Sequence, residues 1–150
     1  MSKRLRTSIL LLGMLTSLSA CAEPTPPPAA DNSDYPQSVD LAGQTYRLES
    51  VGQACVLRKP DQSVLPLDIA SPCHFSVGKD GQAHVETFQN VPIVMVLHVA
   101  PVADSKLECR SQYKAIRLIE DQLEPSVLAR SASCLRGVGD QKNYTAMFDW

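Results

Sequence analysis

The fold of this chain is constrained most by two cysteines, Cys109 and Cys134, that lie equally far on either side of a polar turn. Residues 112–120 and 123–132 have strand-like sequences and flank Asp121 and Gln122, which predicts a β-hairpin that closes at this polar pair. Opposed residues of antiparallel strands have Cβ atoms about 4.5–5.5 Å apart, close to what a disulfide needs. A β-bulge would shift the register. The expected opposed pairs are Ile116 with Val127, Leu118 with Pro125, and Cys109 with Cys134, which favours a Cys109–Cys134 bridge.

The other two cysteines of the folded part, Cys55 and Cys73, form the second expected bridge by elimination. Four cysteines allow three connectivities, and the hairpin argument favours one of them. The loop between Cys55 and Cys73 contains Pro60, Pro66 and Pro72, so we expect little regular structure there. Residues 39–150 have the length of one small domain, whose thin core two disulfides would stabilise.

Most other segments have the patterns of short antiparallel strands. Glycines in the turn Gly78-Lys79-Asp80-Gly81 favour a hairpin between the segments on either side. The run 91–99 is almost continuously apolar, which indicates a central strand buried on both faces. The expected strands outside the first hairpin are 43–49, 54–58, 74–77, 82–88 and 91–99.

The chain ends in an alternating pattern. Tyr144, Ala146, Phe148 and Trp150 occupy every second position, which predicts a final strand with an inward aromatic face and Trp150 as a closing core residue. No long amphipathic helix is expected. The predicted fold class is therefore mostly β, a small disulfide-stapled antiparallel β-sandwich or open barrel.

The first 21 residues have the organisation of a bacterial export signal. Three basic residues precede an apolar run, residues 9–18, that is shorter than the roughly 20 residues a transmembrane helix needs. The next residues, Leu18-Ser19-Ala20-Cys21, resemble the lipobox of bacterial lipoproteins. This resemblance implies cleavage before Cys21 and acylation of its thiol with fatty acids such as palmitate. Because Ala22 follows rather than Asp, it also implies sorting to the outer membrane, with the domain facing the periplasm.

These features divide the chain into a signal peptide (1–20), a lipidated cysteine with a proline-rich tether (21–38) and a single β-rich domain (39–150). Polyproline II chain advances about 3.1 Å per residue, so the tether could hold the domain up to roughly 50 Å from the bilayer. Of the 14 Lys and Arg residues, Lys3, Arg4 and Arg6 leave with the signal, so 11 remain against 16 acidic residues, a formal charge of −5. An acidic surface argues against a nucleic-acid partner, and membrane attachment would depend on the acyl chains.

Residues that could support catalysis or bind a metal do not form a recognisable pattern. His74, His84 and His98 lie on different expected strands without metal-ligand spacing. Cys73 is adjacent to His74, and neighbouring strand residues point to opposite faces. The sequence therefore predicts no metal, no cofactor and no enzymatic activity. Four acidic residues are interpreted as a solvated edge that discourages strand-to-strand aggregation: Glu108, Glu120, Asp121 and Glu124.

A rigid β scaffold without a catalytic pattern favours a binding function. Our hypothesis is a lipid-anchored inhibitor or immunity-type protein that blocks a protein partner in the cell envelope, because rigidity lowers the ordering cost of association. Residues 41–46, followed by Cys55 and Cys73, resemble the opening of small periplasmic metalloprotease-inhibitor barrels. The resemblance covers part of the domain, and the cysteine pair after Lys106 departs from it, so it assigns no inhibitory residue.

The alternative function is an outer-membrane assembly or secretion accessory, pilotin-like or a structural subunit. In either case, binding residues concentrate on loops and turn tips, which tolerate substitution. The candidate partner-binding residues are Lys79, Asp80, Asp121 and Gln122.

Overall fold

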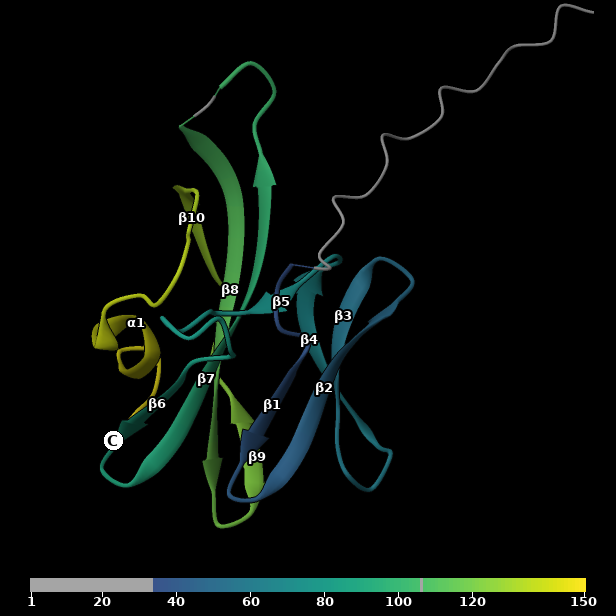
Figure 1. Cartoon of the computed structure of the whole chain (residues 1–150), viewed down its shortest axis with the longest axis vertical. Coiled ribbons are helices and arrows are strands. Elements are labelled where there is room, and N and C mark those ends of the chain that lie inside the picture. The colour runs from purple at the N-terminus through teal and green to yellow at the C-terminus, as the bar shows by residue number, and fades with distance from the viewer. Residues whose placement is uncertain (1–33, 106) are drawn as a thin grey trace, which may run out of the picture.

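The first of two antiparallel sheets is built from consecutive strands. The computed structural model describes residues 34–105 and 107–150. The sheet follows chain order through β1 (Ser38–Leu41), β2 (Gln44–Val51), β3 (Ala54–Arg58) and β4 (Val64–Ala70) (Figure 1). Ala42 and Gly43, both with positive φ (48° and 77°), form the turn between β1 and β2. Two-residue turns of this kind match the twist of the flanking strands. The signal peptide, Cys21 and most of the predicted tether lie outside the described residues.

The second sheet is centred on the long hairpin of β7 (Val91–Pro101) and β8 (Glu108–Ile119). Each side of this hairpin pairs with an edge strand that is broken into two pieces. On the β7 side the pieces are β5 (His74–Phe75) and β6 (Val85–Phe88), and on the β8 side they are β9 (Gln122–Pro125) and β10 (Ala129–Ser133). Between β5 and β6 the chain leaves the sheet as a loop, and at its base His84 N donates to Ser76 O (2.8 Å).

The second sheet is buried on both faces. Val94 and Val96 of β7 and Ile116 of β8 pack with side chains of the first sheet in one hydrophobic cluster. The alternate residues Ile93 and Met95 pack in a second cluster on the opposite face. Successive strand residues point to opposite faces, so a nearly continuous apolar run supplies both clusters. The prediction of a central strand buried on both faces is confirmed, and so is the mostly β, disulfide-stapled antiparallel fold, here a sandwich.

The prediction of a C-terminal strand is wrong, because a short helix, α1 (Gln141–Thr145), covers the second cluster. Asp140 caps this helix, with its side chain accepting from Lys142 N (3.0 Å). Tyr144 and Phe148 are four residues apart, so their spacing also suits one face of a helix, and both join the second cluster. Tyr144 is fully buried, whereas Trp150, the predicted closing core residue, is 46% exposed.

Trp150 instead covers a buried arginine. The guanidinium of Arg117 lies 4.5 Å from the ring centroid of Phe148 and 4.8 Å from that of Trp150. Its Nε donates to Glu124 Oε2 (2.7 Å), and its Nη1 donates to the carbonyl of Asp149 (2.9 Å). These contacts hold the chain end against β8 and β9. Glu124, interpreted from sequence as part of a solvated edge, is the ion-pair partner of Arg117, whose hydrogen bond lowers the pKa of this carboxyl.

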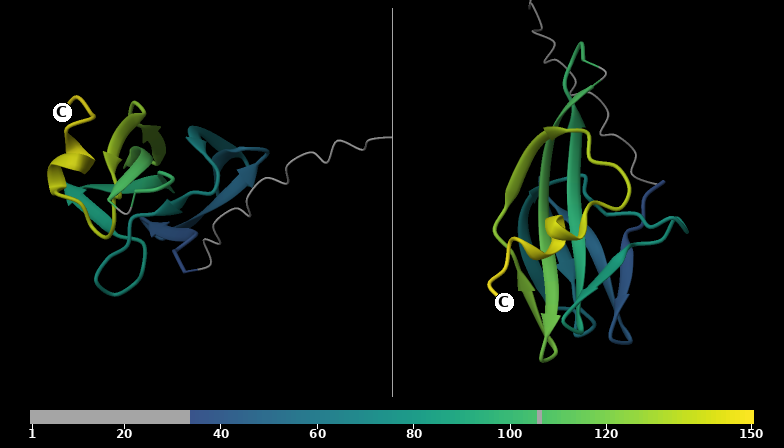
Figure 2. Two further views of the ribbon diagram at one scale, coloured as in Figure 1. Left: turned by 90° about the horizontal axis from the view of Figure 1, so that it is seen from above. Right: turned by 90° about the vertical axis from the view of Figure 1, so that its left-hand side faces the viewer.

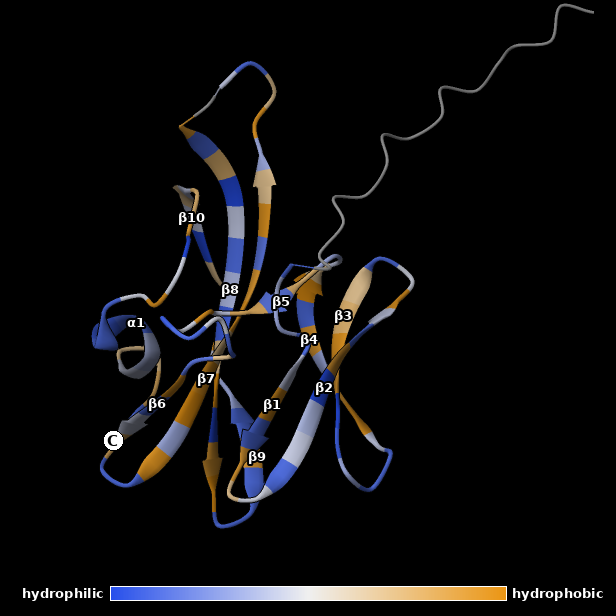
Figure 3. Ribbon diagram, viewed as in Figure 1, coloured by the Kyte–Doolittle hydropathy of each residue, from blue (hydrophilic) through white to orange (hydrophobic). Residues whose placement is uncertain are grey.

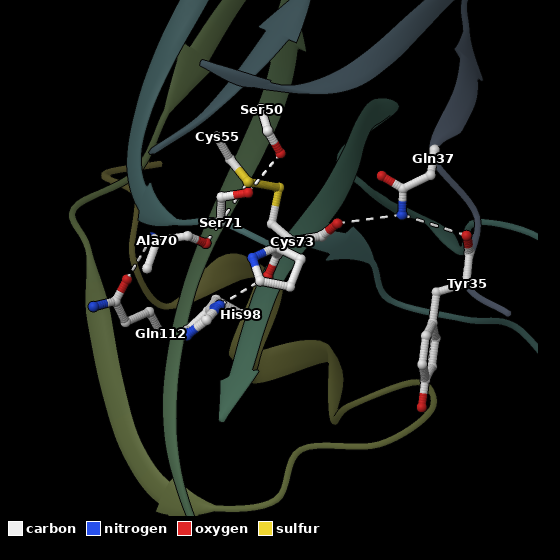
Figure 4. Close-up of a disulfide and its surroundings, with 10 residues drawn as sticks. Tyr35, Gln37, Ser50, Cys55, Ala70, Ser71, Cys73, His98 and Gln112 are labelled. Atoms are coloured by element: carbon white, nitrogen blue, oxygen red, sulfur yellow. Dashed lines mark hydrogen bonds between the residues drawn. A yellow bond between two sulfur atoms is a disulfide. The ribbon is translucent and has the colours of Figure 1, made fainter. Parts of the chain in front are cut away.

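Both predicted disulfides form. Cys55 and Cys73 join β3 of the first sheet to the start of β5 in the second, with Cα atoms 6.3 Å apart (Figure 4). The Cα atoms of Cys109 and Cys134 are 4.9 Å apart. In the chain-entropy model, bridges that close loops of about 20 residues each contribute roughly 3 kcal/mol. The expectation of little regular structure between Cys55 and Cys73 is wrong, because β4 lies there at the edge of the first sheet, where Pro66 is tolerated.

The register predicted for the hairpin between residues 112–120 and 123–132 is also wrong in detail. The turn consists of Glu120 and Asp121, both with positive φ (50° and 62°), instead of Asp121 and Gln122. Ile116 therefore opposes Pro125, two residues from its predicted partner, and Gln112 opposes Arg130, one residue from the predicted register. The register shifts again between Ser131 and Ser133, next to the Cys109–Cys134 bridge. The disulfide pairing was correct although the strand register used to derive it was not.

Candidate functional site

An open groove lies on the part of the second sheet that projects beyond the sandwich. Residues 98–101 of β7 and 108–112 of β8 are here called the arm. They begin beside the last residue of β4, and this end of the β7–β8 hairpin projects past the first sheet (Figures 1 and 2). The part of β8 in the arm is mainly hydrophilic, whereas the part of β7 inside the sandwich is mainly hydrophobic (Figure 3). Along β7 and β8 the side chains that face the first sheet have even numbers, and this face continues onto the arm.

Strand pairing sets the positions of the groove side chains. His98, Gln112 and Arg130 form one row across β7, β8 and β10, and Ala100 and Arg110 form the next row. Ala132 of β10 completes the lining together with neighbouring residues, and the groove has a volume of about 580 Å³. Two alanines lie among longer polar side chains, so the hollow forms where side chains are small.

The segment that links β4 to β5 fixes two groove side chains. Ala70 N donates to Gln112 Oε1 (2.8 Å) and His98 Nδ1 donates to the carbonyl of Pro72 (2.8 Å), since a carbonyl oxygen can only accept (Figure 4). Cys73, one residue further, is held by the bridge to Cys55. The oxygen of Gln112 is thus engaged, and the hydrogen-bonding group it can offer a ligand is its NH₂ donor.

The charged side chains that line the groove are two arginines. Arg110 and Arg130 are both exposed, and His98 is half-buried. No carboxylate lines the groove in the part of the chain that the structure describes. The hydroxyl of Ser111 is already used, since it donates to Ser133 O (2.7 Å). A groove lined by cationic and neutral donors is suited to an anionic or carbonyl-rich ligand.

Lys114 follows Gln112 on the same face of β8 and lies beneath β4. Its side chain is 8% exposed, and Nζ lies 3.5 Å from Oδ2 of Asp68. Asp68 has a positive φ (56°) at the place where the pairing of β3 and β4 shifts register. The bulge turns this carboxylate toward Lys114, so Lys114 is paired with the first sheet, whereas Arg110 of the arm and Arg130 of β10 line the groove.

The sequence neighbours Cys73 and His74 have structural roles. Cys73 is oxidised, and the ring of His74 stacks on that of Tyr35 with centroids 4.1 Å apart. Burial lowers the pKa of His74, so its imidazole is neutral at neutral pH. This pair supplies neither a thiolate nor a cation to the neighbouring groove.

Ser76, His84 and Glu86 are the residue types of a hydrolytic triad, but they do not have its geometry. Ser76 Oγ is hydrogen-bonded to the hydroxyl of Tyr144 (2.8 Å) and Ser76 is 1% exposed. His84 Nε2 lies 3.3 Å from Glu86 Oε2, and the His84 ring packs edge-on against Tyr144. The serine is thus bonded to a tyrosine and closed to substrate. Among residues 34–105 and 107–150, no three His, Cys, Asp or Glu side chains are grouped to hold a metal ion.

The four predicted partner-binding residues are exposed and lie at two separate tips (Figure 2). Lys79 and Asp80 are at the end of the loop between β5 and β6, where Asp80 Oδ1 accepts from Gln82 N (3.0 Å). Asp121 and Gln122 lie at the β8–β9 turn, beside Tyr46 of the first sheet in a hollow of about 340 Å³. Burial, followed by the charge of Asp121, raises the pKa of Tyr46. The structure does not bring the two tips together.

Sequence reasoning missed the groove residues Arg110, Gln112 and Arg130. Their signal was the pairing of β8 with β10, because Arg130 shares a face with Gln112 only in the observed register. The predicted register pairs Arg130 with Tyr113 instead. A slip of one residue moves a strand's side chains to the other face, so Arg130 would point away from the groove.

Comparisons with protein-family models, with curated proteins and with solved structures gave no match to this chain. Among the described residues, no helix has the length and hydropathy to cross a membrane.

Proposed function

We propose that this chain is a lipid-anchored periplasmic binding protein of the inhibitor or immunity type, which blocks a protein partner in the cell envelope. The observation that supports this function most directly is the groove, an open hollow on a sheet that two disulfides hold in place. A preorganised surface lowers the entropic cost of binding, which suits a protein that must hold a partner tightly. We place the partner in the groove and against the arm.

The arrangement of the groove favours ligand binding over catalysis. His98 and Gln112 are fixed by backbone partners, and the lining offers hydrogen-bond donors to a ligand. A neutral His98 that donates through Nδ1 keeps Nε2 as an acceptor in the lining. The two arginines and the NH₂ of Gln112 are donors, and this predominance of donors supports a binding role.

Filling the groove tests this proposal. We expect Ala132→Trp to reduce capture of the partner at least about tenfold, a loss of roughly 1.4 kcal/mol, because the indole would occupy the hollow. Ala146→Trp is the matched control, since Ala146 is also exposed and lies outside the groove. The measurement is cross-linking of the full lipidated protein in membranes, followed by quantitative mass spectrometry of the cross-linked proteins.

Three outcomes distinguish the candidate surfaces and the two candidate functions. Loss of the same cross-linked protein with Ala132→Trp, but not with Ala146→Trp, supports the groove. Equal capture by both variants, with loss on changing Lys79 and Asp80 or Asp121 and Gln122, would place binding on the turn tips and overturn the groove assignment. A captured partner that is a subunit of a secretion or assembly machine would favour the accessory function over inhibition.

The lipid anchor is a second part of the proposal, and it depends on Cys21. We expect Cys21→Ser to abolish recovery of the protein with outer membranes, because a serine cannot receive the thioether-linked lipid and stable attachment needs more than one acyl chain. Membrane flotation and metabolic labelling with palmitate measure the result. Unchanged flotation of the variant with outer membranes would show that the lipobox interpretation is wrong.

A further inference from the structure

We propose that the groove receives an extended, carboxylate-bearing segment of the protein partner. This inference rests on the proposed function and adds the chemistry of the bound segment. It follows from the side chains that face the groove, from the open edge of β10 beside them, and from the contrast between the groove and the charge of the rest of the molecule.

The groove presents three donor groups in a geometry suited to carboxylates. Arg130 on β10 and Arg110 on β8 lie in neighbouring rows, and Gln112 on β8 lies between β7 and β10 in the row of Arg130. A guanidinium offers a planar fork of N–H donors that matches the two oxygens of a carboxylate. No acidic side chain of the lining competes for these arginines. Two carboxylates of one peptide can therefore bind without displacing an internal ion pair.

The edge of the sheet favours an extended segment. β10 is the terminal strand of its sheet, so its outer edge pairs with no further strand among the described residues. An extended peptide added to such an edge is held by main-chain hydrogen bonds, and alternate side chains point to one face of the sheet. Carboxylates at alternate positions of the peptide would then lie on the sheet face that carries Arg130 on the neighbouring strand β10 and Arg110 one strand further, on β8.

The charge of the whole molecule limits which anions can bind. The mature chain has an expected formal charge of −5, since 11 basic side chains remain against 16 acidic ones after signal removal. A long polyanion would extend past the groove and be repelled by the net negative charge of the molecule. At physiological ionic strength charges interact over about 8 Å, so a short acidic segment experiences mainly the groove.

The test uses two blocked twelve-residue peptides, one of alternating Glu and Thr and one of alternating Gln and Thr. We expect the Glu peptide to bind the full lipidated protein in nonionic detergent at least tenfold more tightly by fluorescence anisotropy, with affinity that falls as salt rises. Hydrogen-exchange mass spectrometry should show protection in β8 and β10. Equal binding of the two peptides, or protection confined to other strands, would overturn the inference.

Paired substitutions connect this binding to the arginines. Arg110→Gln with Arg130→Gln should remove the preference for the Glu peptide. Arg47→Gln with Lys142→Gln changes the net charge equally at exposed positions outside the groove, and it should keep the preference. A preference that survives the first pair, or is lost with the second, would contradict the assignment to Arg110 and Arg130.

The outcomes distinguish the inference from the proposed function. If Arg110→Gln with Arg130→Gln retains capture of the partner while Ala132→Trp loses it, the groove is the binding site but acidic recognition is wrong. If vesicles containing phosphatidylglycerol bind in an arginine-dependent way and the Glu peptide does not, the groove recognises lipid and the inference is overturned.

Discussion

Replacing Val94 with aspartate is expected to abolish folding. Val94 is fully buried in β7, between Val85 of β6 and Ile116 of β8, and it faces the first sheet. A carboxylate at this position would be buried without a partner, at a cost of several kcal/mol. The total stability of a small domain is about 5–15 kcal/mol, so little would remain. Circular dichroism and the soluble yield of the protein measure the effect.

Val127→Asp is the matched control for this substitution. Val127 is 71% exposed, at the break between β9 and β10, so the same change should shift stability by about 0.5 kcal/mol or less. If Val94→Asp melted within a few degrees of the parent, the placement of β7 at the centre of the sandwich would be wrong.

Replacing Tyr144 with alanine is expected to give the second largest effect. Its fully buried ring joins α1 to β7 and β8, so the change leaves a cavity and should cost about 3–5 kcal/mol. Tyr144→Phe should cost about 1–3 kcal/mol, because the hydroxyl of Ser76, also buried, loses its partner. Chemical denaturation monitored by fluorescence gives both free energies.

Trp150→Ala tests whether the partly exposed Trp150 contributes less to stability than the buried Tyr144. Trp150 is about half exposed and packs on Arg117 and Phe88, so its removal should destabilise the domain less than Tyr144→Ala. The reverse order would contradict the role of α1 as the cover of the second hydrophobic cluster.

The core strand was predictable from sequence, whereas the C-terminal cover was not. The run 91–99 is apolar at odd and even positions, and this pattern requires burial on both faces. For the last residues two periods fit equally well, because Tyr144 and Phe148 are an even number of residues apart and also one helical turn apart. The capping side chain of Asp140 was the local signal for the helix.

The candidate site depended on register, which sequence defines less well than strand identity. The disulfide pairing tolerates a shift of two residues, because the two cysteines stay on the same face and can reach each other diagonally, and so it was predicted correctly. The face on which Arg130 lies tolerates no shift, since each step of one residue reverses it. Turn tips such as Lys79 and Asp121 were identified from composition, but a groove assembled from three strands has no local sequence signal.

The interrupted edges of this sandwich have a consequence for a protein confined to a surface. Attachment to a membrane would restrict copies to two dimensions, where they collide often and in similar orientations, and a long straight strand edge would template pairing between them. The four-residue β1 is too short for this, and Pro66 and the bulge at Asp68 disrupt β4. The β5–β6 edge is broken by a loop, and the β9–β10 edge is interrupted between Pro125 and Ala129, which leaves the five residues of β10 as a short edge. Dense populations of the protein should therefore remain as separate molecules, each with an open groove.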